Sequence, residues 1–141
     1  MRRRAIPILL LAALPLSPAS AQGDPTALAL AREYVERHRG TLPDLEQLTL
    51  AAVGGGEDPE GLRLEAAMRA ELEAAEPKYR EAMARLLATG LDLSVLQHAL
   101  ADGSIRARIA SSPNARRLSS DLNRLTVETV AGISERVLRH R

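Results

Sequence analysis

The sequence of 141 residues contains no cysteine, no phenylalanine and no tryptophan, and its only tyrosines are Tyr34 and Tyr79. Without cysteine the chain can form no disulfide, carries no cysteine nucleophile, and has no thiol to which a lipid could be attached. Because the larger aromatic residues are missing, the core has to be built from Leu, Ala, Val, Ile and Met. That composition favours helices.

Catalytic and metal-binding motifs are also missing from the sequence. There is no Gly-x-Ser-x-Gly elbow, and the triple glycine at 54–56 is followed by the acidic Glu57 and Asp58, which would repel a phosphate. None of His38, His98 and His140 has a His or Glu three or four residues before it, as helical metal sites require. We therefore predict that the protein is not an enzyme and has no catalytic, cofactor-binding or metal-binding residues. A histidine brought close to an acidic side chain by the fold would contradict this prediction.

The first 21 residues have the pattern of a bacterial secretory signal peptide. Three arginines at positions 2–4 precede an apolar run over 5–16, and Ala19-Ser20-Ala21 forms a small-x-small cleavage site. The apolar run is too short to cross a bilayer. We predict a signal peptide at 1–21, a single all-α domain at 22–141, and a periplasmic or secreted protein that is not an integral membrane protein after cleavage.

Charge is distributed unevenly along the remaining chain. Without the first 21 residues there are 16 basic and 18 acidic residues, a balance that gives no indication of nucleic-acid binding. The stretch from Glu57 to Glu76 holds seven acids and two arginines, whereas Gly103 to Arg141 holds eight arginines and three acids. Two interpretations stay open: solvated faces, with an acidic helix beside a basic one, or a basic C-terminal face that meets an acidic partner or anionic lipid headgroups.

The last third of the chain has the clearest helical pattern. Ser112 and Pro113 are typical of an N-cap and a first helical position, and the helix is expected to run to Arg139. Its apolar residues recur at intervals of three or four and form a stripe that other helices must cover. This stripe consists of Leu118, Leu122, Leu125, Thr129, Ile133 and Val137, widened by Ala115, Val130 and Leu138.

Similar signals predict an all-α bundle of five to seven helices with a long C-terminal helix. No segment alternates polar and apolar residues as a strand would. A helix is expected from Thr41 to Val53 with Leu45, Leu48 and Ala52 facing inward, and the triple glycine after it reads as a flexible joint. A longer run from Asp58 to Gly90 contains Pro77, which predicts either one kinked helix or two helices meeting there.

The segment Ser112-Pro113-Asn114-Ala115-Arg116-Arg117 resembles the Ser-Pro-x-Gly-basic turn of the exported bacterial helical domain of unknown function 2059. In that family the turn follows a short helix ending in Phe-Tyr, where this chain has Ile109-Ala110, and Ala115 stands in place of the glycine. The resemblance covers about the last third of the chain. It implies an all-α periplasmic domain without an established activity.

Two functional hypotheses follow from these patterns. The first is an exported helical protein with a non-catalytic binding or structural role, whose Ala, Leu and Met faces would bind an unknown protein partner or a second copy of the chain. The alternative is a carrier of an apolar ligand or lipid in a cavity between helices, because a core without Phe or Trp can leave space.

Overall fold

The computed structural model describes residues 24–139, so the predicted signal peptide and His140 lie outside the described part of the chain. Within these residues the fold is all-α, with six α-helices and one short 3-10 helix. In chain order the elements are α1 (Pro25–Arg37), η2 (Arg39–Thr41), α2 (Leu45–Val53), α3 (Pro59–Gly90), α4 (Leu93–Asp102), α5 (Ile105–Ala110) and α6 (Ala115–Leu138). The predicted helical class and the long C-terminal helix are confirmed. The prediction of one domain over 22–141 stays a prediction.

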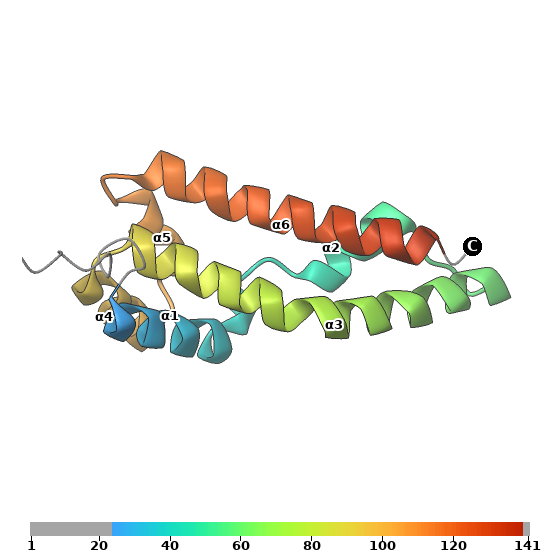
Figure 1. The fold of residues 1–141 in the computed structure, drawn as a ribbon, viewed down its shortest axis with the longest axis horizontal. Helices are drawn as coiled ribbons and strands as arrows, with labels where there is room; N and C mark the ends of the chain where they lie inside the picture. The colour runs from blue at the N-terminus through green and yellow to red at the C-terminus, as the bar shows by residue number, and fades with distance from the viewer. Residues whose placement is uncertain (1–23, 140–141) are drawn as a thin grey trace, which may run out of the picture.

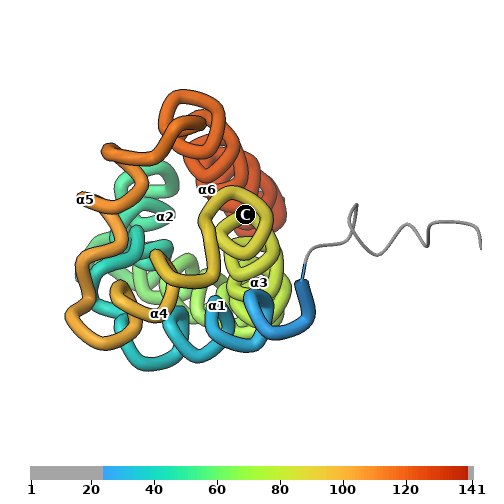
Figure 2. Tube along the Cα trace, turned by 90° about the vertical axis from the view of Figure 1, so that its left-hand side faces the viewer, coloured from blue at the N-terminus to red at the C-terminus, as the bar shows by residue number. Residues whose placement is uncertain are grey.

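The two longest helices, α3 and α6, lie side by side and antiparallel (Figure 1). An ion pair joins Glu71 to Arg136 near one end of this pair, and the hydroxyl groups of Tyr79 and Thr126 are hydrogen-bonded farther along. Helix α1 packs against α3 and α4, and α2 packs against both long helices. The view along the bundle in Figure 2 shows the shorter helices to one side of this pair and below it. The core therefore lies between the α3–α6 pair and the shorter helices.

Three aspartates cap the first turns of helices. Asp24 accepts the backbone N–H of Thr26 at 2.8 Å, and Asp58 accepts that of Gly61 at 2.9 Å. Asp44 accepts two backbone N–H groups at the start of α2. These bonds satisfy donors that a helix leaves unpaired in its first turn.

The predicted second helix is shorter than expected, and its buried face is different. Helix α2 begins at Leu45, not at Thr41, because Pro43 and the capping Asp44 precede it. Leu45 is buried as predicted, but Leu48 is 42 % exposed and Ala52 is also exposed. Thr49 and Val53 are buried in their place. Both sets have helical spacing, and the side that α3 and α6 cover determines which set is buried.

Pro77 lies inside a single continuous helix, so the alternative of two separate helices is wrong. Helix α3 spans 32 residues, and Figure 1 shows that its axis changes direction along its length. Proline removes one backbone N–H from the helix, which commonly bends it. Tyr79 is buried after the proline, and Leu87 is the buried leucine of the last two turns, whereas Leu86 is half-buried.

The predicted start of the last helix is also wrong. Helix α6 begins at Ala115 with Asn114 in the N-cap position, and Asn114 makes no side-chain capping bond. The hydroxyl of Ser112 donates to the carbonyl of Ile109 at 2.8 Å, so this serine closes α5 and does not cap α6. Leu118, Ile133 and Val137 of the predicted stripe are buried, Leu122 and Leu125 are half-buried, and Leu138 is 37 % exposed.

Candidate functional site

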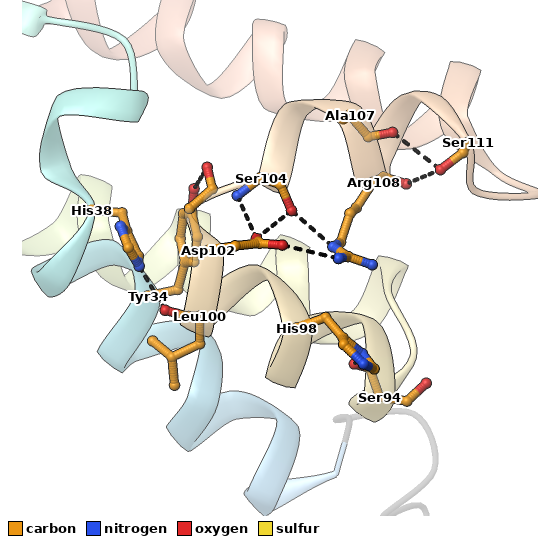
Figure 3. Close-up of polar contacts among 11 residues, drawn as sticks. Tyr34, His38, Ser94, His98, Leu100, Asp102, Ser104, Ala107, Arg108 and Ser111 are labelled. Carbon is orange, nitrogen blue, oxygen red and sulfur yellow. Dashed lines mark hydrogen bonds and ion pairs between the residues drawn. The ribbon is translucent and has the colours of Figure 1, made fainter.

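The fold does not bring either described histidine to a carboxylate. His38 Nε2 lies 2.7 Å from the carbonyl oxygen of Leu100, and its ring packs on Tyr34 with the ring centroids 4.8 Å apart. His98 Nδ1 lies 2.6 Å from the carbonyl oxygen of Ser94 in its own helix (Figure 3). No group of three or more metal-ligating side chains occurs among residues 24–139. These histidines therefore have structural contacts and form no visible acid–base pair with a carboxylate.

The contact of His38 is part of a set of hydrogen bonds between the end of α1 and the end of α4. The hydroxyl of Tyr34 lies 2.8 Å from Thr41 Oγ1 and 3.1 Å from the carbonyl oxygen of Gly103. Thr41 Oγ1 donates to the carbonyl of His38 at 2.8 Å. Together these bonds fix the segment after α1 against the turn that leads into α5.

A second polar cluster fixes the start of α5 (Figure 3). Asp102 accepts the backbone N–H and the hydroxyl of Ser104, and its other oxygen lies 3.1 Å from Arg108 Nη2. Arg108 Nε also donates to Ser104 Oγ at 2.8 Å. The bonds from Ser104, together with the nearby guanidinium of Arg108, lower the pKa of Asp102 to about 2. This cluster sets the direction of the short helix that follows.

An apolar cleft of about 440 Å³ that is open to solvent is lined by Thr41 of the first cluster and by residues of α5, the helix that the second cluster fixes. The cleft lies between the segment before α2, α2 itself, the second half of α3, α5 and the first half of α6. Its apolar lining consists of Leu42, Pro43, Leu48, Met83, Leu87, Ile105, Ile109, Ala110 and Leu122, and its polar lining of Thr41, Arg106, Ser119, Asn123 and Thr126. Its lining is more apolar than that of a slightly larger depression of about 490 Å³ between α3 and α6, so we treat it as the candidate functional site.

The inner wall of the cleft is core, and its rim is exposed. Met83, Leu87 and Ile105 are 1–2 % exposed, whereas Leu48 at the rim is 42 % exposed. Thr126 on the inner wall accepts a hydrogen bond from Tyr79 at 2.9 Å, because its own hydroxyl hydrogen goes to the carbonyl of Leu122. Burial raises the pKa of Tyr79, so its phenol stays protonated at neutral pH. The inner wall is therefore uncharged and its hydroxyl groups are satisfied.

Of the described residues that line the cleft, Arg106 is the only charged one. It is exposed and forms no hydrogen bond or ion pair with any residue in the described part of the chain. Arg108, two residues later on the same short helix, is occupied by Asp102 and Ser104. The guanidinium of Arg106 is therefore free to bind a group that enters from solvent.

The basic C-terminal region divides into paired and unpaired arginines. Arg108, Arg136 and Arg139 form ion pairs with Asp102, Glu71 and Glu135. Four others have no ion pair among residues 24–139, namely Arg106, Arg116, Arg117 and Arg124. Among the arginines of residues 103–139, Arg136 pairs with an acidic residue of α3, Glu71, and four are without an ion pair in the described part of the chain, so an acidic helix beside a basic one explains a small part of the charge pattern of this region.

The sequence pattern predicted a small part of the apolar wall and not the site. Leu48 and Leu122 were expected on apolar helix faces, whereas Arg106 carried no signal beyond its membership of a basic region. Thr41, Leu42 and Pro43 were assigned to the following helix. Their place at the rim depends on the tertiary hydrogen bonds of Tyr34 and Thr41, which no local pattern reveals.

Comparison with known proteins adds no family. No protein-family model matches the chain, and neither does any curated protein or solved structure. The resemblance to the domain of unknown function 2059 therefore stays a prediction. Among the described residues, none of the helices is long and apolar enough to cross a membrane.

Proposed function

We propose that the protein acts after export as a non-catalytic binding protein and that the apolar cleft is its binding site. The observation that carries the proposal is a cleft of about 440 Å³ that is open to solvent and whose inner wall is formed by core residues. Sites for small molecules are concave, mainly apolar and supplied with a few polar groups, with volumes of roughly 300–1,000 Å³. The cleft has all of these features.

Of the two kinds of occupant that the sequence suggests, the cleft favours an apolar ligand over a protein partner. A stable protein interface buries roughly 800 Å² on each partner. The most exposed large apolar side chains of the described chain, Leu48, Leu62, Val127 and Leu138, are distributed over three helices, and only Leu48 borders the cleft. We therefore place the function closer to that of a ligand carrier than to that of a dimerisation module.

A neutral fluorescent probe tests the proposal directly. The chain from Gln22 onward would be titrated with N-phenylnaphthylamine, whose emission rises in apolar surroundings. Ala110→Trp places a large side chain at the cleft, and Ala131→Trp is the matched control, because Ala131 is also an exposed helical alanine but does not line the cleft. We expect saturable binding that Ala110→Trp weakens about tenfold or more and Ala131→Trp leaves unchanged.

Two results would contradict the proposal. One is the absence of saturable probe binding to a folded wild-type chain. The other is equal binding by both tryptophan variants. Light scattering after size-exclusion chromatography adds a third readout: a stable dimer that excludes the probe, and that Leu48→Ser dissociates, would show that the cleft is covered by a second copy of the chain.

A further inference from the structure

We infer that the ligand of the cleft is a single-chain amphiphile with an anionic head, such as a long-chain carboxylate, and that the guanidinium of Arg106 binds this head. The inference rests on the function proposed above and specifies the chemistry of the ligand. It also assigns a role to Arg106, a residue that the fold does not otherwise use.

The position of Arg106 on α5 is the first argument. Its neighbours Ile105 and Ile109 are buried against the core, and Arg106 itself lines the cleft while remaining exposed. An arginine in such a place can cover apolar surface with its carbon stem and keep its charged end in solvent. The Asp102–Ser104–Arg108 cluster fixes the start of α5 and thereby the position of this side chain. An arginine placed in this way binds carboxylates through a planar pair of N–H donors.

The distribution of polar groups around the cleft is the second argument. Ser119 and Asn123 follow each other at one-turn spacing on α6 and line the cleft together with Arg106. The remaining wall is formed largely by leucine, isoleucine and methionine side chains from α2, α3 and α5. The cleft thus has a polar edge at α5 and α6 and an apolar interior, which matches a molecule with one polar end.

The sign of the charge is the third argument. No acidic residue is among the lining residues, and Arg106 has no counter-ion within residues 24–139. Arg116 lies one turn before Ser119 on α6 and is also unpaired there, so it adds to the positive potential at this edge. This positive potential attracts an anionic head, repels a cationic head and has little effect on a neutral one.

Head-group competition tests the inference. Dodecanoate, dodecanol and dodecylamine have chains of equal length, and each would be used below its micellar concentration to displace the neutral probe. We expect dodecanoate to compete about tenfold better than dodecanol, as a charge-assisted hydrogen bond predicts, and dodecylamine to compete worst. Arg106→Gln should reduce dodecanoate competition to that of dodecanol, both being measured against the probe affinity of this same variant.

Arg117→Gln is the matched control, because Arg117 is also an exposed, unpaired arginine but does not line the cleft. It should bind dodecanoate as the wild type does, and unchanged thermal unfolding of both variants shows that they are folded. If the probe does not bind at all, the proposed function fails. If the probe binds but dodecanoate and dodecanol compete equally, or if Arg106→Gln and Arg117→Gln behave alike, only the present inference fails. Binding to anionic phosphatidylglycerol vesicles without any dodecanoate binding would also overturn it, in favour of membrane-surface attachment.

Discussion

At the scale of single residues, Gly61 is the glycine on which the packing depends most directly. A Cβ atom at this position would lie 2.5 Å from both the backbone nitrogen and the carbonyl oxygen of Gly56. The sequence singles out the triple glycine at 54–56 as a flexible joint, and the structure shows that its last member packs tightly on the first turn of α3. Only a glycine in that turn allows the two backbones to approach so closely.

We expect Gly61→Ala to lower the free energy of unfolding by about 1–3 kcal/mol, because the added methyl group meets backbone that cannot move aside without shifting the α2–α3 connection. Urea-induced unfolding followed by circular dichroism measures this change. Gly40→Ala is the matched control, since a Cβ at Gly40 meets nothing within 4 Å. Equal free energies of unfolding for the two variants would show that the α2–α3 connection can shift to accommodate the methyl group at little cost.

Asp102 gives a second prediction at this scale, which concerns pH. Its pKa in the folded state is about 2, whereas an aspartate in an unfolded chain has a pKa of about 3.9. Because the folded pKa is the lower one, its contribution to stability is present above about pH 4 and is lost as the pH falls towards 2. We expect wild type to have a higher melting temperature than Asp102→Asn at pH 7 and the same one near pH 2.

Asp92→Asn serves as the control for the loss of a carboxylate, because Asp92 begins α4 without a side-chain capping bond. It should lack the large pH-dependent difference expected for Asp102→Asn. A difference for Asp102→Asn that persists unchanged at pH 2 would mean that the Ser104 and Arg108 bonds do not act through the ionised carboxylate.

At the scale of the elements, the helix positions could be predicted well and their rotation less well. Asp24 and Asp58, each followed by a proline, mark helix starts that the structure confirms, because capping is a local interaction between adjacent residues. The predicted buried face of α2 was wrong because Leu48 and Thr49 are adjacent and only one of them can face the core. Hydropathy alone favours the leucine for this position. The contacts with α3 and α6 decide in favour of Thr49.

This rotation leaves a polar group without a partner, which is itself testable. Thr49 is fully buried, and its hydroxyl has no hydrogen-bond partner among the described residues. Thr49→Val keeps the shape and removes the hydroxyl, so we expect the free energy of unfolding to rise by about 1 kcal/mol. Thr126→Val is the matched contrast: its hydroxyl is bonded to Tyr79 and Leu122, and its loss should destabilise by a similar amount. Urea unfolding of the two variants should therefore give changes of opposite sign.

At the scale of the whole molecule, the residue types of the candidate site could be predicted from the sequence, but their arrangement in space could not. A helical core of Leu, Ile and Met follows from composition and spacing. The cleft exists because residues from five segments, between Thr41 and Thr126, meet along α5, and the hydrogen bonds that bring them together join residues up to 69 positions apart. Such long-range contacts leave no periodic trace, which is why Arg106 could be assigned only to a basic region and not to a site.

The last prediction concerns export of the whole chain. If residues 1–21 are a signal peptide, expression of the complete sequence in a bacterium with a periplasm should yield a protein that begins at Gln22, as intact-mass measurement of the periplasmic fraction would show.

Ala19→Arg together with Ala21→Arg removes the small residues at the cleavage site and should leave an uncleaved, membrane-associated precursor, whereas Ala12→Leu preserves the apolar run and should be processed normally. The described helices begin at Pro25, the cap of α1 is Asp24, and every described residue of the bundle and the cleft lies after the proposed cleavage site, so we expect the cleaved product to keep the cleft. A cytoplasmic product that retains Met1 would contradict the export proposal and leave the ligand experiments unaffected.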